Sequence, residues 1–384
     1  MCNIDAKSKH VGLNFSPQGS PAACGASVSR CEDGRTTTVD RFWLCVSGGF
    51  RIVGGTMADV VTFGEIMLRL NTPGRQRFSQ ASSFEIAFGG AEANVAVAIA
   101  QLGGSADFVT RVPQNEIAQR AMDELRRLGV GVAKVVRGGA RIGVNFLEIG
   151  ASQRPGKVIY DRSHTSMAEA QPHEFDWDAI LAGARWFHWS GITAALSESA
   201  AATAAAAAAA ARRLGLTVSF DMNYRAKLWT TEQAGAVLTP LMKHVNICSC
   251  GAEEARSVFG INAEREEAIA AALVKRFGFD AVTMTQRRAA TADHSSWSAM
   301  FHTGGKTYTS QRHEITIIDR VGAGDSFVGA LIFSMLRGDS PQRAIDFAAA
   351  ASALKHTIPG DYSLVSLAEV EALAGGGHGG RVQR

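Results

Sequence analysis

The segment Asp319-Arg320-Val321-Gly322-Ala323-Gly324-Asp325-Ser326-Phe327 joins two different local patterns. Before it, Ile315-Thr316-Ile317-Ile318 is typical of a β-strand, and after it the apolar residues from Phe327 to Leu336 predict a helix that ends near Gly338. Glycines on both sides of Ala323 allow several main-chain N–H groups to converge on an anion, with the helix dipole behind them. The segment therefore predicts an anion-binding turn between a strand and a helix.

Asp325 lies within this turn, where a carboxylate would repel a bound phosphate. It therefore needs another role, and accepting a proton from a hydroxyl that attacks the phosphorus is the natural one. We expect Asp325 to be a catalytic base, with Gly322, Ala323 and Gly324 forming the anion hole beside it.

Strands and helices alternate from residue 58 onward, as expected for a doubly wound α/β protein. The predicted core strands are Val60–Phe63, Asp107–Thr110, Trp186–Trp189, Thr217–Asp221, Val245–Cys248 and Ala281–Thr285. The predicted helices are Ala91–Leu102, Glu116–Leu128, Glu198–Leu214, Thr231–Met242 and Ala263–Phe277. We predict a mostly parallel sheet flanked by helices.

Two stretches interrupt this alternation, at residues 66–88 and about 139–165. They contain strand-like runs separated by turns, with polar residues on both sides of the period. We expect them to form a small β-sheet lid over the C-terminal edge of the main sheet, where α/β proteins bind ligands.

The ends of the chain differ in composition from the middle. Residues 1–57 are rich in Gly, Ser, Thr and Cys and show no sustained hydrophobic period, so we expect a disordered leader or a start codon placed too early, with Met57 as the true start. A regulatory or targeting arm is the alternative. The globular domain is predicted to span 58–374, and the glycine-rich tail 375–384 to be flexible.

Composition excludes some partners. A net charge of +3 is too small to indicate nucleic acid, and no apolar run approaches the ~20 residues of a membrane span. Four of six cysteines precede Met57, with spacings unlike those of zinc sites. We expect Cys248 and Cys250 to face opposite sides of one strand and to stay unpaired, which suits a reducing cytoplasm.

Two motifs resemble signatures of the ribokinase-like (PfkB) carbohydrate kinases. The anion turn resembles the second signature, although Arg320 stands where Thr, Pro, Ser or Val is usual; Gly89-Gly90-Ala91-Glu92-Ala93-Asn94-Val95-Ala96 resembles the first. Their order and separation match that family. The resemblance covers about 58–374 and implies a kinase that uses ATP and Mg²⁺.

Further stretches resemble the branch of this family that phosphorylates the terminal hydroxyl of 2-dehydro-3-deoxygluconate to give the 6-phosphate. They include Lys157-Val158-Ile159-Tyr160-Asp161-Arg162 and Asp221-Met222-Asn223-Tyr224-Arg225. A sugar acid needs a cation for its carboxylate and short polar groups for its hydroxyls. Arg162 from the lid and Arg225 after a strand end could supply the cations; a solvated surface position is the alternative for either.

The resemblance also assigns the remaining site positions. The predicted substrate-binding residues are Gly90, Asn94, Tyr160, Arg162, Ile192, Arg225 and Asp325, with Asn94 as a possible helix cap instead. The predicted nucleotide-binding residues are Thr285, Arg287, Gly322, Gly324, Ala351 and Lys355. Glu254 is expected to act on Mg²⁺ through water, in a segment where Gly251 replaces the usual Asn.

Other functions remain open at this point. Another sugar of the family, such as ribose, fructose or a nucleoside, is one alternative, and a non-catalytic sugar-acid-binding protein is another. A nicotinamide dehydrogenase would need G-x-G-x-x-G after the first strand, and Gly64-Glu65-Ile66-Met67 lacks it. By analogy with the family we also expect a homo-oligomer.

Overall fold

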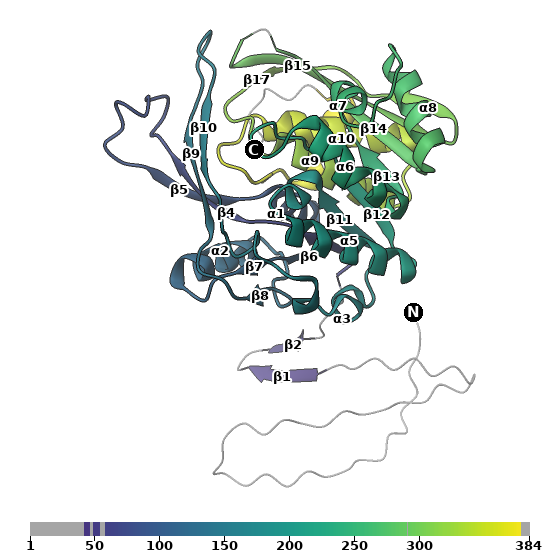
Figure 1. The fold of residues 1–384 in the computed structure, drawn as a ribbon. Coiled ribbons are helices and arrows are strands. Elements are labelled where there is room, and N and C mark those ends of the chain that lie inside the picture. Colours follow the sequence, from purple (N-terminus) through teal and green to yellow (C-terminus); the bar gives the residue numbers. More distant parts are fainter. Residues whose placement is uncertain (1–41, 47–48, 54–57, 290, 378–384) are drawn as a thin grey trace, which may run out of the picture. The chain divides into compact units, whose positions relative to one another are not determined.

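The computed structural model describes residues 42–46, 49–53, 58–289 and 291–377, which fall into two units, Met1–Thr56 and Met57–Arg384 (Figure 1). In the first unit, β1 (Phe42–Val46) pairs antiparallel with β2 (Gly49–Val53), a regular element that we did not expect from the sequence. The rest of the predicted leader and residues 378–384 of the predicted tail lie outside the described residues.

The second unit is built on a nine-stranded sheet. Its parallel strands, in spatial order, are β14 (Ala281–Ala289), β13 (Ile247–Ser249), β12 (Thr217–Asp221), β11 (Trp186–Ser190), β3 (Val60–Phe63) and β6 (Ala106–Val109). Three antiparallel strands extend the β14 edge: β15 (His294–Thr303), β16 (Lys306–Thr309) and β17 (His313–Thr316). The predicted mostly parallel α/β sheet is therefore confirmed.

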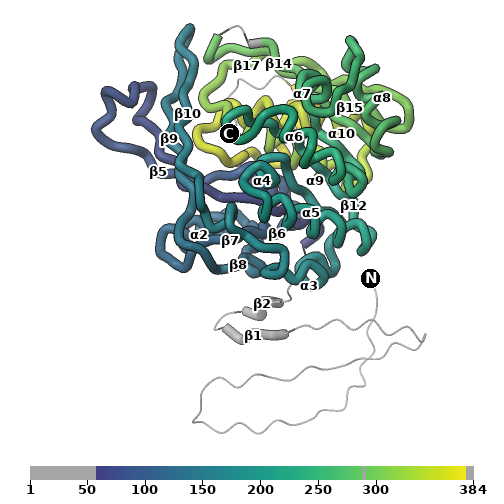
Figure 2. Tube along the Cα trace, in the orientation of Figure 1, coloured from purple at the N-terminus to yellow at the C-terminus, as the bar shows by residue number. Residues whose placement is uncertain are grey.

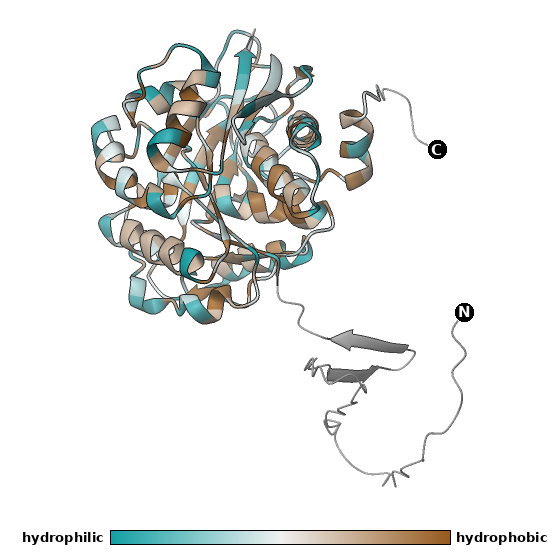
Figure 3. Ribbon diagram, turned by 90° about the vertical axis from the view of Figure 1, so that its right-hand side faces the viewer, coloured by the Kyte–Doolittle hydropathy of each residue, from teal (hydrophilic) through white to brown (hydrophobic). Residues whose placement is uncertain are grey.

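Helices cover both faces of this sheet because successive strand residues point to opposite sides. Val60 packs into the hydrophobic cluster on one face and Val61 into the cluster on the other. The first face carries α1 (Ala91–Gln101), α2 (Glu116–Arg127), α9 (Ala323–Leu336), α10 (Pro341–Lys355) and α11 (Leu367–Ala374). The second carries α3 (Trp177–Leu181), α4 (Gly191–Ala194), α5 (Glu198–Arg213), α6 (Thr231–Leu238), α7 (Ala252–Ser257) and α8 (Glu266–Phe277). Figure 3 shows the hydrophobic colour concentrated where these helices meet the strands.

Some boundaries differ from the predicted ones for local reasons. The helix predicted over Thr231–Met242 ends at Leu238 and continues as a 3₁₀ helix over Thr239–His244, which has Pro240 in its first turn. Helix α9 begins at Ala323, before the predicted start at Phe327, so Asp325 lies in its first turn.

The predicted orientation of the two strand cysteines is wrong. Residues two apart on a strand share a side, and Cys248 and Cys250 are buried in the same hydrophobic cluster. Both thiols are free, as expected, and the neighbouring thiol together with burial raises the pKa of Cys250.

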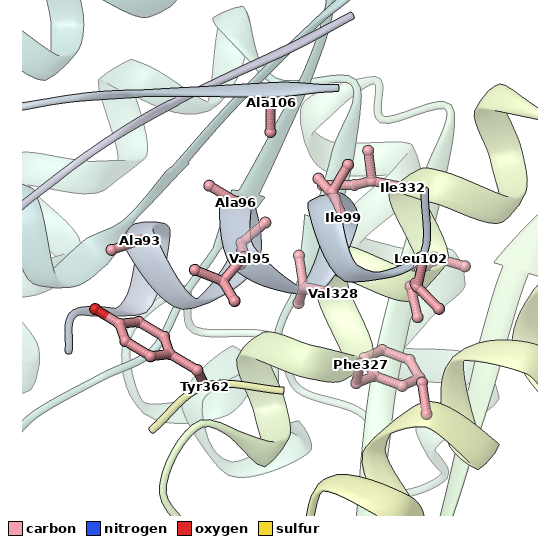
Figure 4. Packing of buried hydrophobic residues seen from close by; sticks show 14 of the residues in the cluster. Ala93, Val95, Ala96, Ile99, Leu102, Ala106, Phe327, Val328, Ile332 and Tyr362 are labelled. Carbon is pink, nitrogen blue, oxygen red and sulfur yellow. The ribbon is translucent and has the colours of Figure 1, made fainter. Parts of the chain in front are cut away.

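Helices α1 and α9 lie side by side, and their contact positions the two sequence motifs (Figure 4). Val95 and Ile99 of α1 face Val328 and Ile332 of α9. The approach is close because Gly329 has no side chain: a Cβ there would lie 2.8 Å from the Ala98 Cβ and 3.0 Å from the Val95 carbonyl oxygen. This packing brings the beginnings of both helices together.

A separate four-stranded sheet, here called the lid sheet, is formed by the two stretches that interrupt the alternation. Its order is β10 (Lys157–Asp161), β9 (Gly143–Glu148), β4 (Met67–Asn71) and β5 (Glu85–Gly89). Chain segments of two different colours meet in it (Figure 2), with β4 and β9 paired in parallel. The short strands β7 (Arg111–Val112) and β8 (Val136–Arg137) form a further pair. The predicted small sheet is confirmed.

We predict that a chain beginning at Met57 folds and works like the full chain. The unit Met57–Arg384 contains both hydrophobic clusters and the whole of the main and lid sheets. Thermal unfolding should give a melting temperature within about 2 °C of that of the full chain, with unchanged turnover. A large loss of either would make the leader part of the fold.

Candidate active site

A cavity of about 340 Å³ lies between the lid sheet and the C-terminal ends of the parallel strands. Every position predicted to bind substrate lines it: Gly90, Asn94, Tyr160, Arg162, Ile192, Arg225 and Asp325. Gly322 and Gly324 of the anion turn also line it, whereas Ala323 is buried beneath them. The cavity thus joins residues from the lid sheet, the main sheet and the starts of α1 and α9.

Among the described residues, one side-chain hydrogen bond holds the Asp325 carboxyl group. Asn94 Nδ2 donates a hydrogen bond to Asp325 Oδ2 at 2.7 Å, across the α1–α9 contact. Burial raises the pKa of Asp325 to about 7; the Asn94 hydrogen bond lowers the pKa, and the negative charge of Asp221 raises it further. A carboxyl group with a pKa near neutrality is suited to exchange protons with a hydroxyl group.

Asp221, at the end of β12, is a second carboxylate in the cavity. Its Oδ1 accepts a hydrogen bond from the Asn223 N–H at 3.2 Å. Burial raises the pKa of Asp221 to about 7, Arg225 lowers the pKa, and the charges of Glu92 and Glu254 raise it. Asp221 therefore lies among other carboxylates, and the positive charge of Arg225 offsets their negative charge only in part.

The anion turn requires glycine at its first position. Gly322 is the N-cap of α9 with φ = 80°, and a Cβ there would lie 1.9 Å from the Asp361 carbonyl oxygen. The Gly324 and Asp325 N–H groups, in the first turn of α9, have no acceptor within the part of the chain that the structure describes. The turn thus presents donors and the positive end of a 14-residue helix to the cavity.

The start of α1 is arranged around Gly90, its N-cap. A Cβ on Gly90 would lie 1.9 Å from the Glu65 carbonyl oxygen, so a close main-chain approach explains this glycine. Asn94 is not the cap: its Oδ1 accepts from the Gly90 N–H at 3.4 Å while its amide nitrogen holds Asp325. Asn94 therefore orients the predicted base.

Glu92 fastens this helix start to the main sheet. Its buried carboxylate accepts from the Ser190 hydroxyl at 2.6 Å, the Ser190 N–H at 3.1 Å and the Thr193 hydroxyl at 2.8 Å. Burial raises the pKa of Glu92, and these hydrogen bonds lower it. The ends of β11 and α4 are thereby tied to α1, which places Ile192 in the cavity wall.

The two predicted arginines occupy different environments. Arg162, buried after β10, pairs with Glu65, which also accepts from the Thr165 hydroxyl at 2.6 Å. Arg162 Nε is buried and has no hydrogen-bond partner among the described residues, and the guanidinium lies 5.4 Å from the Tyr160 ring centre. Glu65 already neutralises the charge of Arg162. A substrate carboxylate would therefore compete with Glu65 for the Arg162 guanidinium.

Arg225 is exposed at the cavity mouth. Its Nη1 donates to the main-chain carbonyls of Asn223 and Tyr224 at 3.2 and 3.0 Å, and no carboxylate among the described residues forms an ion pair with it. The loop after β12 thus holds a cation that is available to a ligand.

The predicted nucleotide positions are not gathered in one place. Thr285 and Arg287 of β14 line a different groove of about 530 Å³, which shares no lining residue with the first cavity. Ala351 and Lys355 are fully buried in α10 and line neither cavity, and Lys355 Nζ donates to the Ile358 carbonyl at 3.1 Å. A direct nucleotide contact for these two side chains is therefore not supported.

Glu254 lies in the first turn of α7, beside Asp221. Its carboxylate folds over Gly251, where a Cβ would lie 2.0 Å from Glu254 Oε2. Within the described residues no three His, Cys, Asp or Glu side chains are grouped as ligands for a metal ion. The carboxylates fit a hard cation that keeps water and phosphate ligands, and not an all-protein metal cage.

Several cavity residues were not predicted from the sequence. They are Glu65, Arg69, Glu92, Asn145, Asp221, Arg320 and Asp361. Glu65 and Asp221 follow parallel strands at their carboxyl ends, a signal that could have identified them. Arg69 gave no such signal, because one charged residue in an alternating strand usually faces water.

The α/β sheet carries a carboxylate of raised pKa beside a helix start whose first N–H groups have no acceptor among the described residues. This arrangement suits the transfer of a phosphoryl group to a hydroxyl. The family model of the pfkB family carbohydrate kinases matches residues 57–366. The chain belongs to this family and is a carbohydrate kinase. No helix in the described part is long and apolar enough to cross a membrane.

Similar proteins include kinases that are named for 2-dehydro-3-deoxy sugar acids. The chain is 36% identical to a 2-dehydro-3-deoxygalactonokinase of Haloferax volcanii, over 84% of this chain and 98% of the relative. It is 30% identical to a 2-dehydro-3-deoxygluconokinase of Thermoproteus tenax, over 83% and 94%. A solved structure of 2-dehydro-3-deoxygluconokinase from Thermotoga maritima matches with a TM-score of 0.81 and 48% identity, over 83% of this chain and all of that one.

We predict that Asp325→Asn lowers turnover about 10²- to 10⁴-fold, the usual contribution of a positioned general base. In the wild type, kcat/KM should rise with pH and level off above about 7, because only the deprotonated carboxylate accepts a proton. Asp221→Asn should move this rise to lower pH, since it removes a neighbouring negative charge. Steady-state kinetics over a pH series checks both.

A loss of turnover through unfolding is separable from this effect. A carboxyl group whose pKa is raised on folding weakens the fold as pH rises above its unfolded value and through its folded one. Asp325→Asn should therefore melt at the same temperature as the wild type or higher at pH 8. Retention of more than about a third of wild-type turnover would show that Asp325 is not the base.

Proposed function

We propose that this carbohydrate kinase transfers the γ-phosphoryl group of ATP to the terminal hydroxyl of 2-dehydro-3-deoxy-D-gluconate, giving the 6-phosphate. The observation that carries the proposal is that one cavity holds both Asp325 beside the anion turn and the available cation Arg225. These groups suit a hydroxyl to be deprotonated and a carboxylate to be bound. The names of the relatives support the same substrate class.

The residues divide the reaction between them. Arg225 binds the substrate carboxylate, and Arg162 and the Tyr160 ring line the same cavity beside it. As the terminal oxygen forms its bond to phosphorus, its proton passes to Asp325, and ADP leaves as the old P–O bond breaks. The N–H groups of Gly324 and Asp325 stabilise the charge of the phosphoryl group in transit.

Mg²⁺ bound with ATP would neutralise phosphate charge, and Glu254 would hold it through a water molecule, with Asp221 nearby. The Gly251 position leaves room for the Glu254 carboxylate to fold over the main chain.

We predict that Arg225→Ala raises KM for 2-dehydro-3-deoxygluconate about ten- to a hundredfold and leaves KM for ATP unchanged. Arg225→Lys should recover little, because a point charge does not reproduce the planar fork of a guanidinium. Arg185→Ala is the matched control, since the exposed Arg185 immediately precedes β11, at the amino end of the parallel strands, and its Nη1 lies 3.6 Å from Asp59 Oδ1. Initial rates with each substrate varied in turn give these constants.

The substrate class is tested on the wild type with ribose, fructose and adenosine beside the sugar acid. Neutral substrates leave Arg225 without a partner, so their kcat/KM should be far lower. Equal kcat/KM for a neutral sugar would move the protein to another branch of its family, and no ATP consumption with any substrate would indicate a binding protein.

A further inference from the structure

Arg320 immediately precedes the anion turn and separates two cavities. It lines the cavity that contains Asp325 and Arg225. It also lines an adjoining cavity of about 460 Å³, whose walls include the tip of the β9–β10 hairpin and residues 317–321. Its Nη2 donates to the Ala292 carbonyl, which fixes one side of the guanidinium, and the side chain is half-buried. Arg320 and the two glycines of the anion turn thus line the same cavity.

Arg320 forms no ion pair with any residue that the structure describes. The neighbouring carboxylate of Asp319 is already used, since it pairs with Arg69 at 2.7 Å and accepts from the Val321 and Gly360 N–H groups at 3.0 Å. Across the described residues, no carboxylate forms an ion pair with Arg320 or with Arg287. Both guanidinium groups therefore carry uncompensated charge.

The positive charge of Arg287 also acts on Arg320. Burial and the charge of Arg287 both lower the pKa of Arg320, and only Asp319 opposes this. Their charges also act on His356, whose pKa is lowered to about 4, mainly by burial. Two like charges that act on each other are costly unless an anion compensates them.

The turn itself supplies the other half of an anion site. The N–H groups of Gly324 and Asp325 have no acceptor in the described part of the chain, and the dipole of α9 adds to them. We propose that Arg320 binds the phosphate chain of the nucleotide at the phosphoryl group being transferred. This inference rests on the proposed function and adds a catalytic residue to it.

The role of Arg320 in the transfer step is electrostatic. The sugar oxygen forms its bond to the γ-phosphorus, its proton goes to Asp325, and the electron pair of the broken P–O bond leaves with ADP. Arg320 neutralises the charge on the oxygens of the transferred group and forms no covalent bond. A neutral side chain at this position, which is usual in the resembling signature, cannot do this.

Substitutions of Arg320 test the proposal through nucleotide binding alone. Arg320→Met should weaken binding of a non-hydrolysable ATP analogue, with nitrogen in place of the β–γ bridging oxygen, about ten- to a hundredfold in isothermal titration calorimetry without sugar, and leave adenosine binding unchanged. The nucleotide affinity of Arg320→Lys should lie between those of the wild type and Arg320→Met, because lysine keeps the charge and loses the planar fork of the guanidinium. Arg312→Met, an exposed arginine between β16 and β17, is the matched control and should behave as the wild type.

Kinetics with the sugar acid separates the remaining possibilities. Arg320→Met should lower kcat and leave KM for the sugar acid within about twofold. A tenfold rise in that KM with binding of the ATP analogue unchanged would overturn the proposal and assign Arg320 to the substrate carboxylate. Equal losses of ATP-analogue and adenosine binding would also overturn it and leave Arg320 as a support for Ala292. The nucleotide-binding measurement contains no sugar, so a wrong substrate in the proposed function does not affect its outcome.

Discussion

The arrangement of the cavity depends on the ion pairs of one buried side chain, Arg69. Arg69 comes from the lid strand β4, and it pairs with Asp319 before the anion turn and with Asp361 in the loop after α10. Its Nε also donates to Asn71 Oδ1 at 2.5 Å. Removing one partner from a buried ion pair costs about 3–5 kcal/mol, because the other charge is left in a medium that solvates it poorly. The lid sheet and the anion turn are therefore joined by buried ion pairs.

Close main-chain packing completes this junction. A Cβ on Gly89 would lie 2.1 Å from Asp361 Oδ2, and one on Gly322 would lie 1.9 Å from the Asp361 carbonyl oxygen. Burial raises the pKa of Asp361, and the positive charge of Arg69 is the largest effect that lowers it. The Glu65–Arg162 pair makes a second buried link between the main sheet and the lid sheet. Substrate recognition and the anion turn consequently share one rigid frame.

The sequence predicted the parts of the site that depend on local pattern. The anion turn, the alternation of strands and helices, and the positions of Asn94 and Arg225 follow from short motifs at element ends. Arg69 could not be predicted, because its partners Asp319 and Asp361 lie 250 and 292 residues away and only the folded chain brings them together. The prediction that Lys355 binds the nucleotide is not supported, because its side chain is buried. The sequence of the helix does not show that this ammonium group lies inside the protein.

The central claim is that one cavity deprotonates the hydroxyl at one end of a sugar acid while it binds the carboxylate at the other. The most direct measurement is proton-coupled ³¹P NMR of the product formed from ATP and 2-dehydro-3-deoxygluconate. The account predicts one new phosphomonoester whose phosphorus couples to the two protons of the terminal methylene. Coupling to a single proton, which marks a secondary hydroxyl as acceptor, would contradict it, and so would release of inorganic phosphate without any sugar phosphate.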